Sequence, residues 1–369
     1  MKEKNKVLFV LHLPPPVHGA SVVGQNIQNS KYINSTFYSR YINLSASSKV
    51  EEVGSLSIKK LLFLISNWIH CISAIIRFKP TLCYITPTSD GWGFYRDFLL
   101  VQSIKLFDVK IVMHFHNKAS KQWVERGINR WLLKHFFKNV KIILLGKELY
   151  EEKSSFISEN DVFFCPNGVP SVNDKILKTN KKIDKTRFLF LSNMMESKGV
   201  LILLDACKEL YRRGYDFRCD FVGGWKDVTE ELFQNRIKKY NLQDKVYAHG
   251  PKYGDEKKMF FENADVFVFP TYYHGECFPL VLLEAMDYGL PCLSTVNGAI
   301  PSLIDDGLTG FTVPQNDLNA LVLKMIWSIE NPEKMIELGV FGKEKFESYF
   351  TLEQFEKNLT SIFQECIKS

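Results

Sequence analysis

The stretch Val266–Thr295 constrains the fold more than any other part of the sequence. Two short apolar runs, Val266–Pro270 and Pro291–Thr295, have the pattern of buried strands and enclose a loop and a helical segment. A strand, a loop, a helix and a strand in this order form one unit of a doubly wound α/β sheet. In such sheets, ligands bind beyond the carboxyl ends of the strands. The loop therefore lies where a ligand is expected.

Two carboxylates in this unit are candidate ligand contacts. Glu276 lies in the loop and Glu284 on the helix, with the apolar run Phe278–Leu283 between them. A carboxylate at this edge can accept hydrogen bonds from sugar or ribose hydroxyls, and a helix N-terminus beside it favours phosphate oxygens. Taken alone, the same two residues could be a helix cap and a solvated helix residue.

Cysteine usage and hydropathy limit the class of protein. The eight cysteines include no Cys-x-x-Cys pair, which argues against a zinc site and a disulfide framework and favours a reducing cytosol. No apolar run approaches the roughly 20 residues that a spanning helix needs, so we expect no transmembrane helix. The chain also has no Asp-x-Asp triplet. This fits an enzyme that works without a metal ion, and we also predict no cofactor.

Charge is distributed unevenly along the chain. Residues 1–180 hold 24 Lys and Arg against 13 Asp and Glu (net +11), whereas residues 181–369 hold 23 against 28 (net −5). A basic first half could face nucleic acid, an anionic membrane or an anionic substrate.

The first half alternates strands and helices. We predict strands at Lys6–Leu13, Phe37–Leu44, Lys110–His116, Val140–Leu145 and Val162–Cys165, and helices at Ser57–Arg77, Trp92–Phe107 and Lys121–Lys138. The polar, aperiodic residues 171–185 form the expected linker. The predicted domains are therefore residues 1–170 and 186–369.

The first-domain helices allow two interpretations. Ser57–Arg77 has a narrow polar stripe, as in a core helix, but Lys59, Lys60 and Trp68 could instead lie at a membrane interface. Lys121–Lys138 mixes basic residues with Trp123 and Trp131. No recognised nucleic-acid module accompanies this pattern, so we do not predict a nucleic-acid partner.

The second half continues the alternation. Strands are predicted at Arg187–Leu191, Phe217–Gly224 and Val246–Gly250, and a turn with a short strand at 300–313. Gly224 ends its strand in a Gly-Gly pair, which suits close approach of backbone to a ligand. The helices after Asp317 carry no chemical signature.

The pattern Glu-x-Phe-x-x-x-x-x-Glu-Ala-Met-x-x-Gly-Leu-Pro, which starts at Glu276, resembles the donor-binding signature of family 4 retaining glycosyltransferases. The resemblance implies the GT-B fold, in which two doubly wound Rossmann-like domains face each other across a cleft. It also implies that Glu276 contacts the donor sugar and Glu284 the ribose, with Cys277 and Phe278 among the donor-binding residues. Pro279 stands where the family has Gly, so one backbone N–H is missing.

The resemblance extends to other positions. Lys198 matches a family cation that holds the donor pyrophosphate. Asn193 stands where the family has arginine; its amide can still donate a hydrogen bond, but it carries no charge. His116 matches a histidine near the donor sugar, whereas His114 is the better candidate for a core histidine. Gly19 follows the first strand near the phosphates, and the loop Gly250–Gly254, with Tyr253, lies where the base packs. These residues complete the predicted site, with Glu276, Lys198 and His116 as the catalytic set.

The resemblance implies a retaining hexosyltransferase that uses a UDP- or GDP-sugar donor. The acceptor would be a saccharide or a lipid-linked saccharide in capsule, O-antigen (lipopolysaccharide) or exopolysaccharide synthesis. The first domain would bind the acceptor and the second the nucleotide-sugar, with the last helix, Leu352–Ile367, able to cross back onto the first domain. We expect a cytoplasmic protein, either free or peripheral on the inner face of the plasma membrane. The alternatives are a GT-B nucleotide-sugar epimerase and an inactive, membrane-associated sugar-nucleotide-binding protein.

Overall fold

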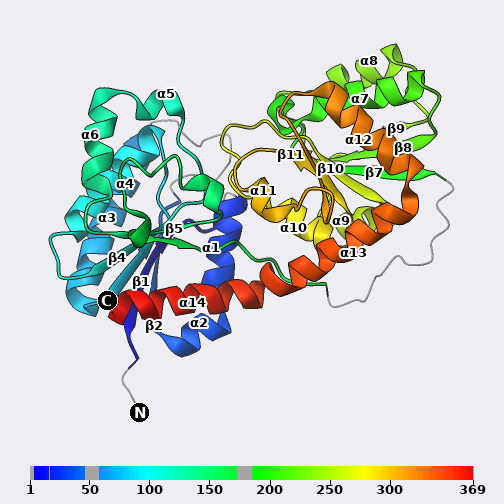
Figure 1. The fold of residues 1–369 in the computed structure, drawn as a ribbon. Coiled ribbons are helices and arrows are strands. Elements are labelled where there is room, and N and C mark those ends of the chain that lie inside the picture. Colours follow the sequence, from blue (N-terminus) through cyan, green and yellow to red (C-terminus); the bar gives the residue numbers. More distant parts are fainter. Residues whose placement is uncertain (1–3, 16, 46–57, 173–184, 369) are drawn as a thin grey trace. The chain divides into compact units, whose positions relative to one another are not determined.

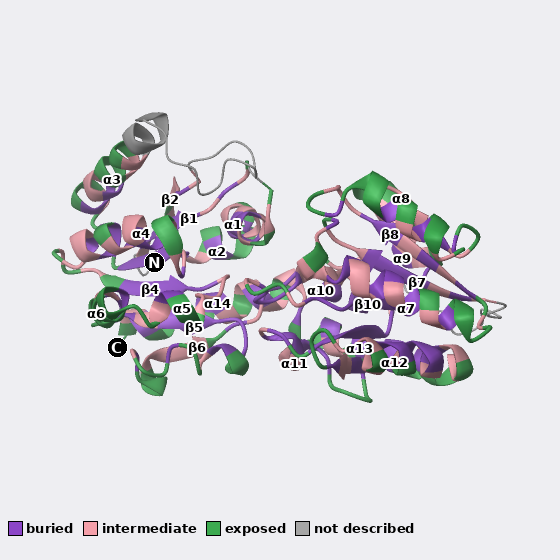
Figure 2. Cartoon of the chain, turned by 90° about the horizontal axis from the view of Figure 1, so that it is seen from above, coloured by how far each residue is buried: buried purple, intermediate pink, exposed green. Residues whose placement is uncertain are grey.

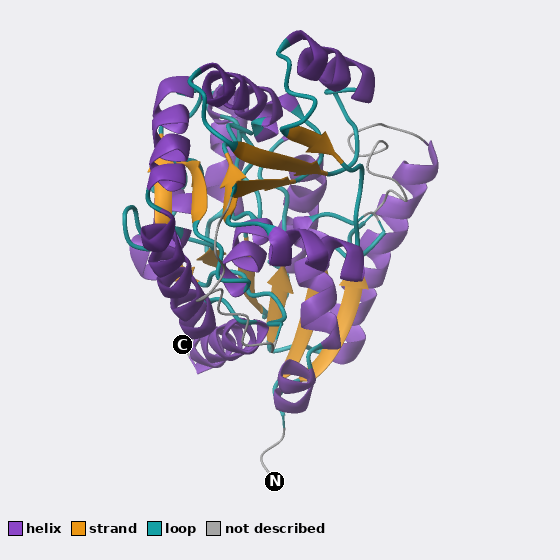
Figure 3. Ribbon diagram, turned by 90° about the vertical axis from the view of Figure 1, so that its right-hand side faces the viewer, coloured by secondary structure: helices purple, strands orange, loops and turns teal. Residues whose placement is uncertain are grey.

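The computed structural model describes residues 4–15, 17–45, 58–172 and 185–368, without the side chains of residues 58–63. The chain divides into two compact units: unit 1 comprises residues 1–168 and 352–369, and unit 2 comprises residues 169–351. Each unit contains one parallel sheet with helices packed against it (Figures 1 and 3). The predicted fold class, two doubly wound α/β domains, is confirmed. Most of the expected linker 171–185 lies outside the described residues.

Unit 1 is built on a six-stranded sheet in the order β2-β1-β3-β4-β5-β6, and all neighbouring strands run parallel. Its strands are β1 (Lys6–Leu11), β2 (Tyr38–Asn43), β3 (Leu82–Ile85), β4 (Lys110–His114), β5 (Lys141–Leu144) and β6 (Val162–Phe164). β1 is buried from Val7 onward, because a parallel sheet covered by helices needs apolar residues on both faces. Figure 2 shows this burial along the strands. The short strand β3, between prolines, was not predicted.

The helices of unit 1 are α1 (Gly19–Asn29), α2 (Lys31–Thr36), α3 (Ile58–Phe78), α4 (Gly91–Ile104), α5 (Lys121–Val124), α6 (Gly127–Phe136) and α14 (Leu352–Lys368), with 3-10 turns η2 (Lys147–Leu149) and η3 (Glu159–Asp161). The single helix predicted at Lys121–Lys138 is wrong. The chain breaks at Arg126, which is extended (φ −64°, ψ 125°), and α6 starts at Gly127. Glycine weakens a helix interior, and this favours the break.

The last helix, α14, belongs to unit 1. It packs against α2, β3 and β4, and the Phe363 ring lies 5.1 Å from the Tyr84 ring and 5.8 Å from the Phe9 ring. Phe363 is fully buried. Burying one Phe side chain contributes ~1.5–3 kcal/mol, so this ring anchors α14 to the sheet.

Unit 2 has a second six-stranded parallel sheet, in the order β12-β11-β10-β7-β8-β9. Its strands are β7 (Thr186–Leu191), β8 (Phe217–Val222), β9 (Val246–Ala248), β10 (Val266–Phe269), β11 (Cys292–Thr295) and β12 (Gly310–Val313). Its helices are η4 (Glu196–Lys198, a 3-10 turn), α7 (Val200–Arg212), α8 (Glu230–Lys239), α9 (Gly254–Asn263), α10 (Leu280–Asp287), α11 (Ile300–Leu303), α12 (Leu318–Glu330) and α13 (Pro332–Tyr349).

Candidate functional site

The strand order of unit 2 contains a switch point between β7 and β10. The chain runs from β7 to β8 and β9 on one side, and from β10 to β11 and β12 on the other. The loops that follow β7 and β10 therefore separate at the carboxyl edge of the sheet, where open α/β sheets bind ligands. Lys198 lies in the first of these loops and Glu276 in the second.

Backbone contacts bind the loops after β7, β10 and β11 together. The Tyr272 amide donates to Ser197 O at 2.8 Å, and the Ala299 amide donates to Cys277 O at 2.8 Å. Gly199 has φ +89°, and a Cβ there would lie 2.3 Å from Pro270 O. Gly298 has φ +54°, and a Cβ there would lie 2.4 Å from Glu276 O. Both glycines are required because only glycine fits these close approaches.

Lys198 and Glu276 form an ion pair at this edge. Lys198 Nζ donates to Glu276 Oε2 at 2.6 Å, and the two side chains are only 16% and 10% exposed. The ammonium also lies 4.4 Å from the centre of the Tyr273 ring, a cation–π contact. Two residues that the sequence separates by 78 positions are thus in direct contact. Each keeps hydrogen-bonding capacity for a ligand, because an ammonium has three donors and a carboxylate two acceptor oxygens.

Glu284 makes a second ion pair. Lys257 Nζ, from α9, donates to Glu284 Oε1 at 2.7 Å, and these side chains are 27% and 30% exposed. Lys257 and Tyr273 were not predicted as site residues, since neither carries a sequence signal of its own. Their roles follow only from the packing of α9 and of the β10 loop.

The other predicted residues of unit 2 are placed differently. Asn193 is exposed in the loop after β7, and a Cβ on Gly224 would lie 3.8 Å from its Oδ1. Tyr253 is 78% exposed at the start of α9. Cys277 and Phe278 are buried, so their side chains point into the core and only their backbone is available to a ligand.

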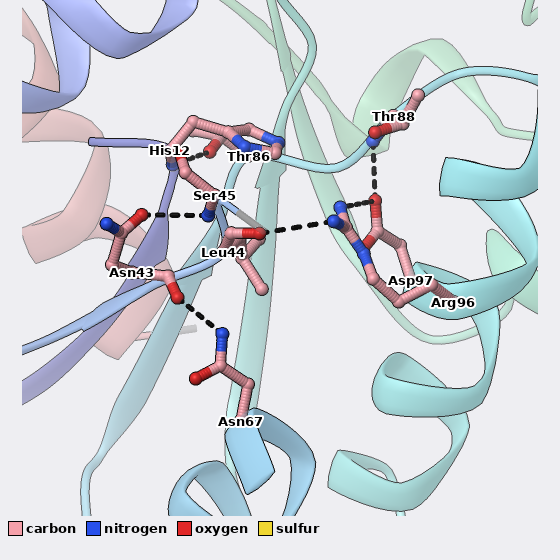
Figure 4. A network of polar contacts seen from close by, with 9 residues as sticks. All are labelled: His12, Asn43, Leu44, Ser45, Asn67, Thr86, Thr88, Arg96 and Asp97. Carbon is pink, nitrogen blue, oxygen red and sulfur yellow. Dashed lines mark hydrogen bonds and ion pairs between the residues drawn. The ribbon is translucent and has the colours of Figure 1, made fainter. Parts of the chain in front are cut away.

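In unit 1, the switch point lies between β1 and β3. His12 follows β1, and its amide donates to Thr86 Oγ1 after β3 at 3.3 Å. Figure 4 shows the polar network around this point. Arg96 makes two hydrogen bonds to the fully buried Asp97 and one to Leu44 O at 3.2 Å. Asp97 Oδ2 also accepts from the Thr88 amide at 2.8 Å, so the network fixes the loop after β3. Because β3 was not predicted, the sequence analysis missed this point.

A cluster of imidazoles lies at the same edge of the sheet. His114 Nδ1 forms a hydrogen bond of 2.8 Å with the Tyr84 hydroxyl, whereas His114 Nε2 is buried without a partner among the described residues. The His116 ring lies 4.2 Å from the His114 ring, and both His116 nitrogens are buried without a partner among the described residues. Burial, followed by the charges of His12 and His18, lowers the pKa of His116 to about 3. Burial lowers the pKa of His12 to about 4. His12 and His116 therefore stay neutral at pH 7.

Gly19 and Gly24 differ in how much space a side chain would have at each position. Gly19 is the first residue of α1, and a Cβ there would meet no atom within 4 Å. A Cβ on Gly24 would lie 2.1 Å from His12 O. Packing therefore requires a glycine at position 24, which the sequence analysis did not single out, and not at position 19.

Two absences hold for the described part of the chain. It contains no group of three or more His, Cys, Asp or Glu side chains that could hold a metal ion. No helix among these residues is long and apolar enough to cross a bilayer.

Residues 171–345, most of unit 2, match the model of the family Glycosyl transferases group 1. The colanic acid glycosyltransferase WcaL of Salmonella typhimurium, itself a putative assignment, is 29% identical over 52% of this chain and 51% of its own. The capsular polysaccharide glycosyltransferase CapM of Staphylococcus aureus is 27% identical over 85% of both chains. The chain spans about half the length of the first curated relatives that it matches.

Solved structures share the fold over nearly the whole chain. A glycosyltransferase of Rickettsia africae has a TM-score of 0.75 at 18% identity, covering 99% of both chains. HepE of Anabaena, solved in complex with UDP, has a TM-score of 0.72 at 14% identity, covering 98% of this chain and 100% of its own. The fold is therefore that of glycosyltransferases with two Rossmann-like domains.

Proposed function

We propose that the protein is a retaining, metal-independent glycosyltransferase that moves a hexose from a nucleotide-sugar to a lipid-linked saccharide in bacterial polysaccharide synthesis. The contact between Lys198 and Glu276 at the switch point of unit 2 carries the proposal. It brings a cation suited to a diphosphate beside a carboxylate suited to sugar hydroxyls. The match of residues 171–345 to the group 1 glycosyltransferase family and the similarity to polysaccharide glycosyltransferases support the same activity.

The proposed chemistry uses residues at the edge of the sheet. The bond between C1 of the sugar and the phosphate oxygen breaks, and the acceptor oxygen bonds to C1 on the same face. The acceptor hydroxyl proton passes to the leaving phosphate. Lys198 stabilises the charge that grows on this phosphate, aided by the N-terminus of α7, which starts two residues later without a side-chain cap. Glu276 orients the sugar, and Glu284 binds the ribose.

The proposed acceptor is lipid-linked because unit 1 exposes basic and apolar residues together. On α6, Ile128 and Trp131 are 70% and 56% exposed, and Arg130 and Lys134 are exposed on the same helix. Basic residues near an anionic leaflet contribute ~1 kcal/mol each, so a few suffice for reversible attachment. The protein would then act at the cytoplasmic face of the membrane.

A donor screen tests the activity. UDP-, GDP- and ADP-hexoses are each incubated with the protein, with and without a polyprenyl-diphosphate saccharide. The expected result is donor consumption that requires the acceptor and yields an α-linked product from an α-linked donor. Consumption without acceptor that yields an epimer would instead establish an epimerase. Binding without turnover of any donor would contradict the proposed enzyme.

Vesicle co-sedimentation tests the membrane site. We expect binding to anionic but not to neutral vesicles, and a loss of binding when Lys121, Arg126, Arg130 and Lys134 are all replaced by Gln. The matched control replaces four exposed basic residues of unit 2, Arg212, Arg213, Lys238 and Lys239. Equal effects of the two sets would contradict a site on unit 1.

A further inference from the structure

Glu284 is held on one side only. Lys257 Nζ donates to Oε1, and no other hydrogen bond or ion pair joins the Glu284 side chain to the described residues. The Glu284 side chain is 30% exposed, so a ligand can reach it. One oxygen of the carboxylate is therefore anchored while the other is open.

The anchor comes from a different element of unit 2. Lys257 lies on α9 and Glu284 on α10, so the ion pair joins two helices that the sequence separates by 27 positions. A glutamate on a helix surface otherwise samples several rotamers, and fixing one costs conformational entropy each time a ligand binds. A partner that fixes the rotamer beforehand removes this cost from binding.

We infer that Lys257 is a positioning residue for ribose recognition: by holding Oε1 of Glu284, it presents Oε2 to the ribose hydroxyls of a nucleoside diphosphate. The inference rests on the proposed function, in which Glu284 meets the ribose. It makes the site selective for ribonucleotides over deoxyribonucleotides. Lys257 itself need not touch the ligand.

The chain provides a matched control on the same helix. Lys258, the next residue, pairs with Glu262 of α9 at 3.7 Å, and both of these side chains are 34% exposed. Lys258→Met therefore removes a lysine of similar exposure, together with its ion pair to Glu262, from α9, but leaves the Lys257–Glu284 pair in place.

Calorimetry on the whole chain tests the inference. UDP, GDP and ADP are titrated into the wild type, and the nucleotide that binds most tightly is compared with its 2′-deoxy and 3′-deoxy analogues. The binding free energy of one hydrogen bond to a charged group predicts about a tenfold preference for the ribonucleotide over its deoxy analogue. We expect Lys257→Met and Glu284→Gln each to reduce the preference to about twofold or less. Lys258→Met should keep it, and Lys257→Arg should restore part of it.

The possible failures are distinguishable. Retention of the full preference by a folded Lys257→Met variant would overturn the inference alone. A wild type that binds the nucleotide without preferring the ribose form would overturn the inference and the assignment of Glu284, but not the transferase. If none of the three nucleotides binds, both the inference and the proposed function fail. A general weakening of affinity with an unchanged preference shows a structural role for Lys257 and also contradicts the inference.

Discussion

Replacing Lys198 by Met should destabilise unit 2 even without a donor. The Lys198–Glu276 pair has an N–O distance of 2.6 Å, and its side chains are 16% and 10% exposed. Removing one partner of a fully buried pair costs ~3–5 kcal/mol, because the other charge is left uncompensated. Since this pair keeps some solvent, we expect ~2–4 kcal/mol for Lys198→Met. For a unit of this size, that lowers Tm by roughly 5–15 °C.

A double-mutant cycle separates the pair from its surroundings. Glu276→Gln keeps a hydrogen-bond acceptor for Lys198 and should cost less than Lys198→Met. In the Lys198→Met background, Glu276→Gln removes a charge that has lost its partner. The coupling free energy from urea denaturation should therefore be ~1–3 kcal/mol.

The more exposed Lys257–Glu284 pair can be compared with the Lys198–Glu276 pair to test the effect of burial on the coupling free energy. Its N–O distance is nearly the same, 2.7 Å, but its side chains are 27% and 30% exposed. Because greater exposure to solvent screens the two charges, the double-mutant cycle of Lys257→Met and Glu284→Gln should give a coupling free energy of only ~0.5 kcal/mol. Equal coupling in the two cycles, or none for Lys198 and Glu276, would refute the argument from burial.

Three further predictions concern the two units. Because burial lowers the pKa of His12 to about 4 and of His116 to about 3, below the ordinary 6.5, the unfolded chain binds more protons in this range. Stability should therefore be full above pH 6.5 and fall as the pH drops toward 4, and His116→Phe should flatten the fall in urea midpoints. Gly24→Ala should lower Tm measurably while Gly19→Ala changes it by under ~2 °C, since only the former would clash with His12 O. Asn193→Arg should tighten nucleoside diphosphate binding several-fold in calorimetry through an added charge, and weaker binding in a folded variant would show that position 193 faces elsewhere.

How far the sequence predicts the site depends on how each residue is positioned. Lys198 and Glu276 follow strands that apolar runs identify, and strand ends gather at one edge of a parallel sheet. Their proximity could therefore be expected. The position of Lys257 depends on the packing angle of α9 against α10, which no local pattern encodes.

The same limit applies in unit 1. The strand β3 has only four residues between prolines, too few for a clear period. Without it, the switch point beside β1 could not be located, and the network of Arg96 and Asp97 was missed. The break before α6 depends on one residue, Arg126, which has an extended backbone although the surrounding sequence favours a helix.

The assignment of α14 to unit 1 bears on how the chain folds during synthesis. Unit 2 is continuous in sequence, whereas the core of unit 1 includes Phe363, which is made after all of unit 2. On a ribosome that adds ~5–20 residues per second, unit 2 is complete while the sheet of unit 1 still lacks its last covering helix. The surface around Tyr84 and Phe9 stays uncovered for that interval, which makes unit 1 the half of the nascent chain that a chaperone would recognise.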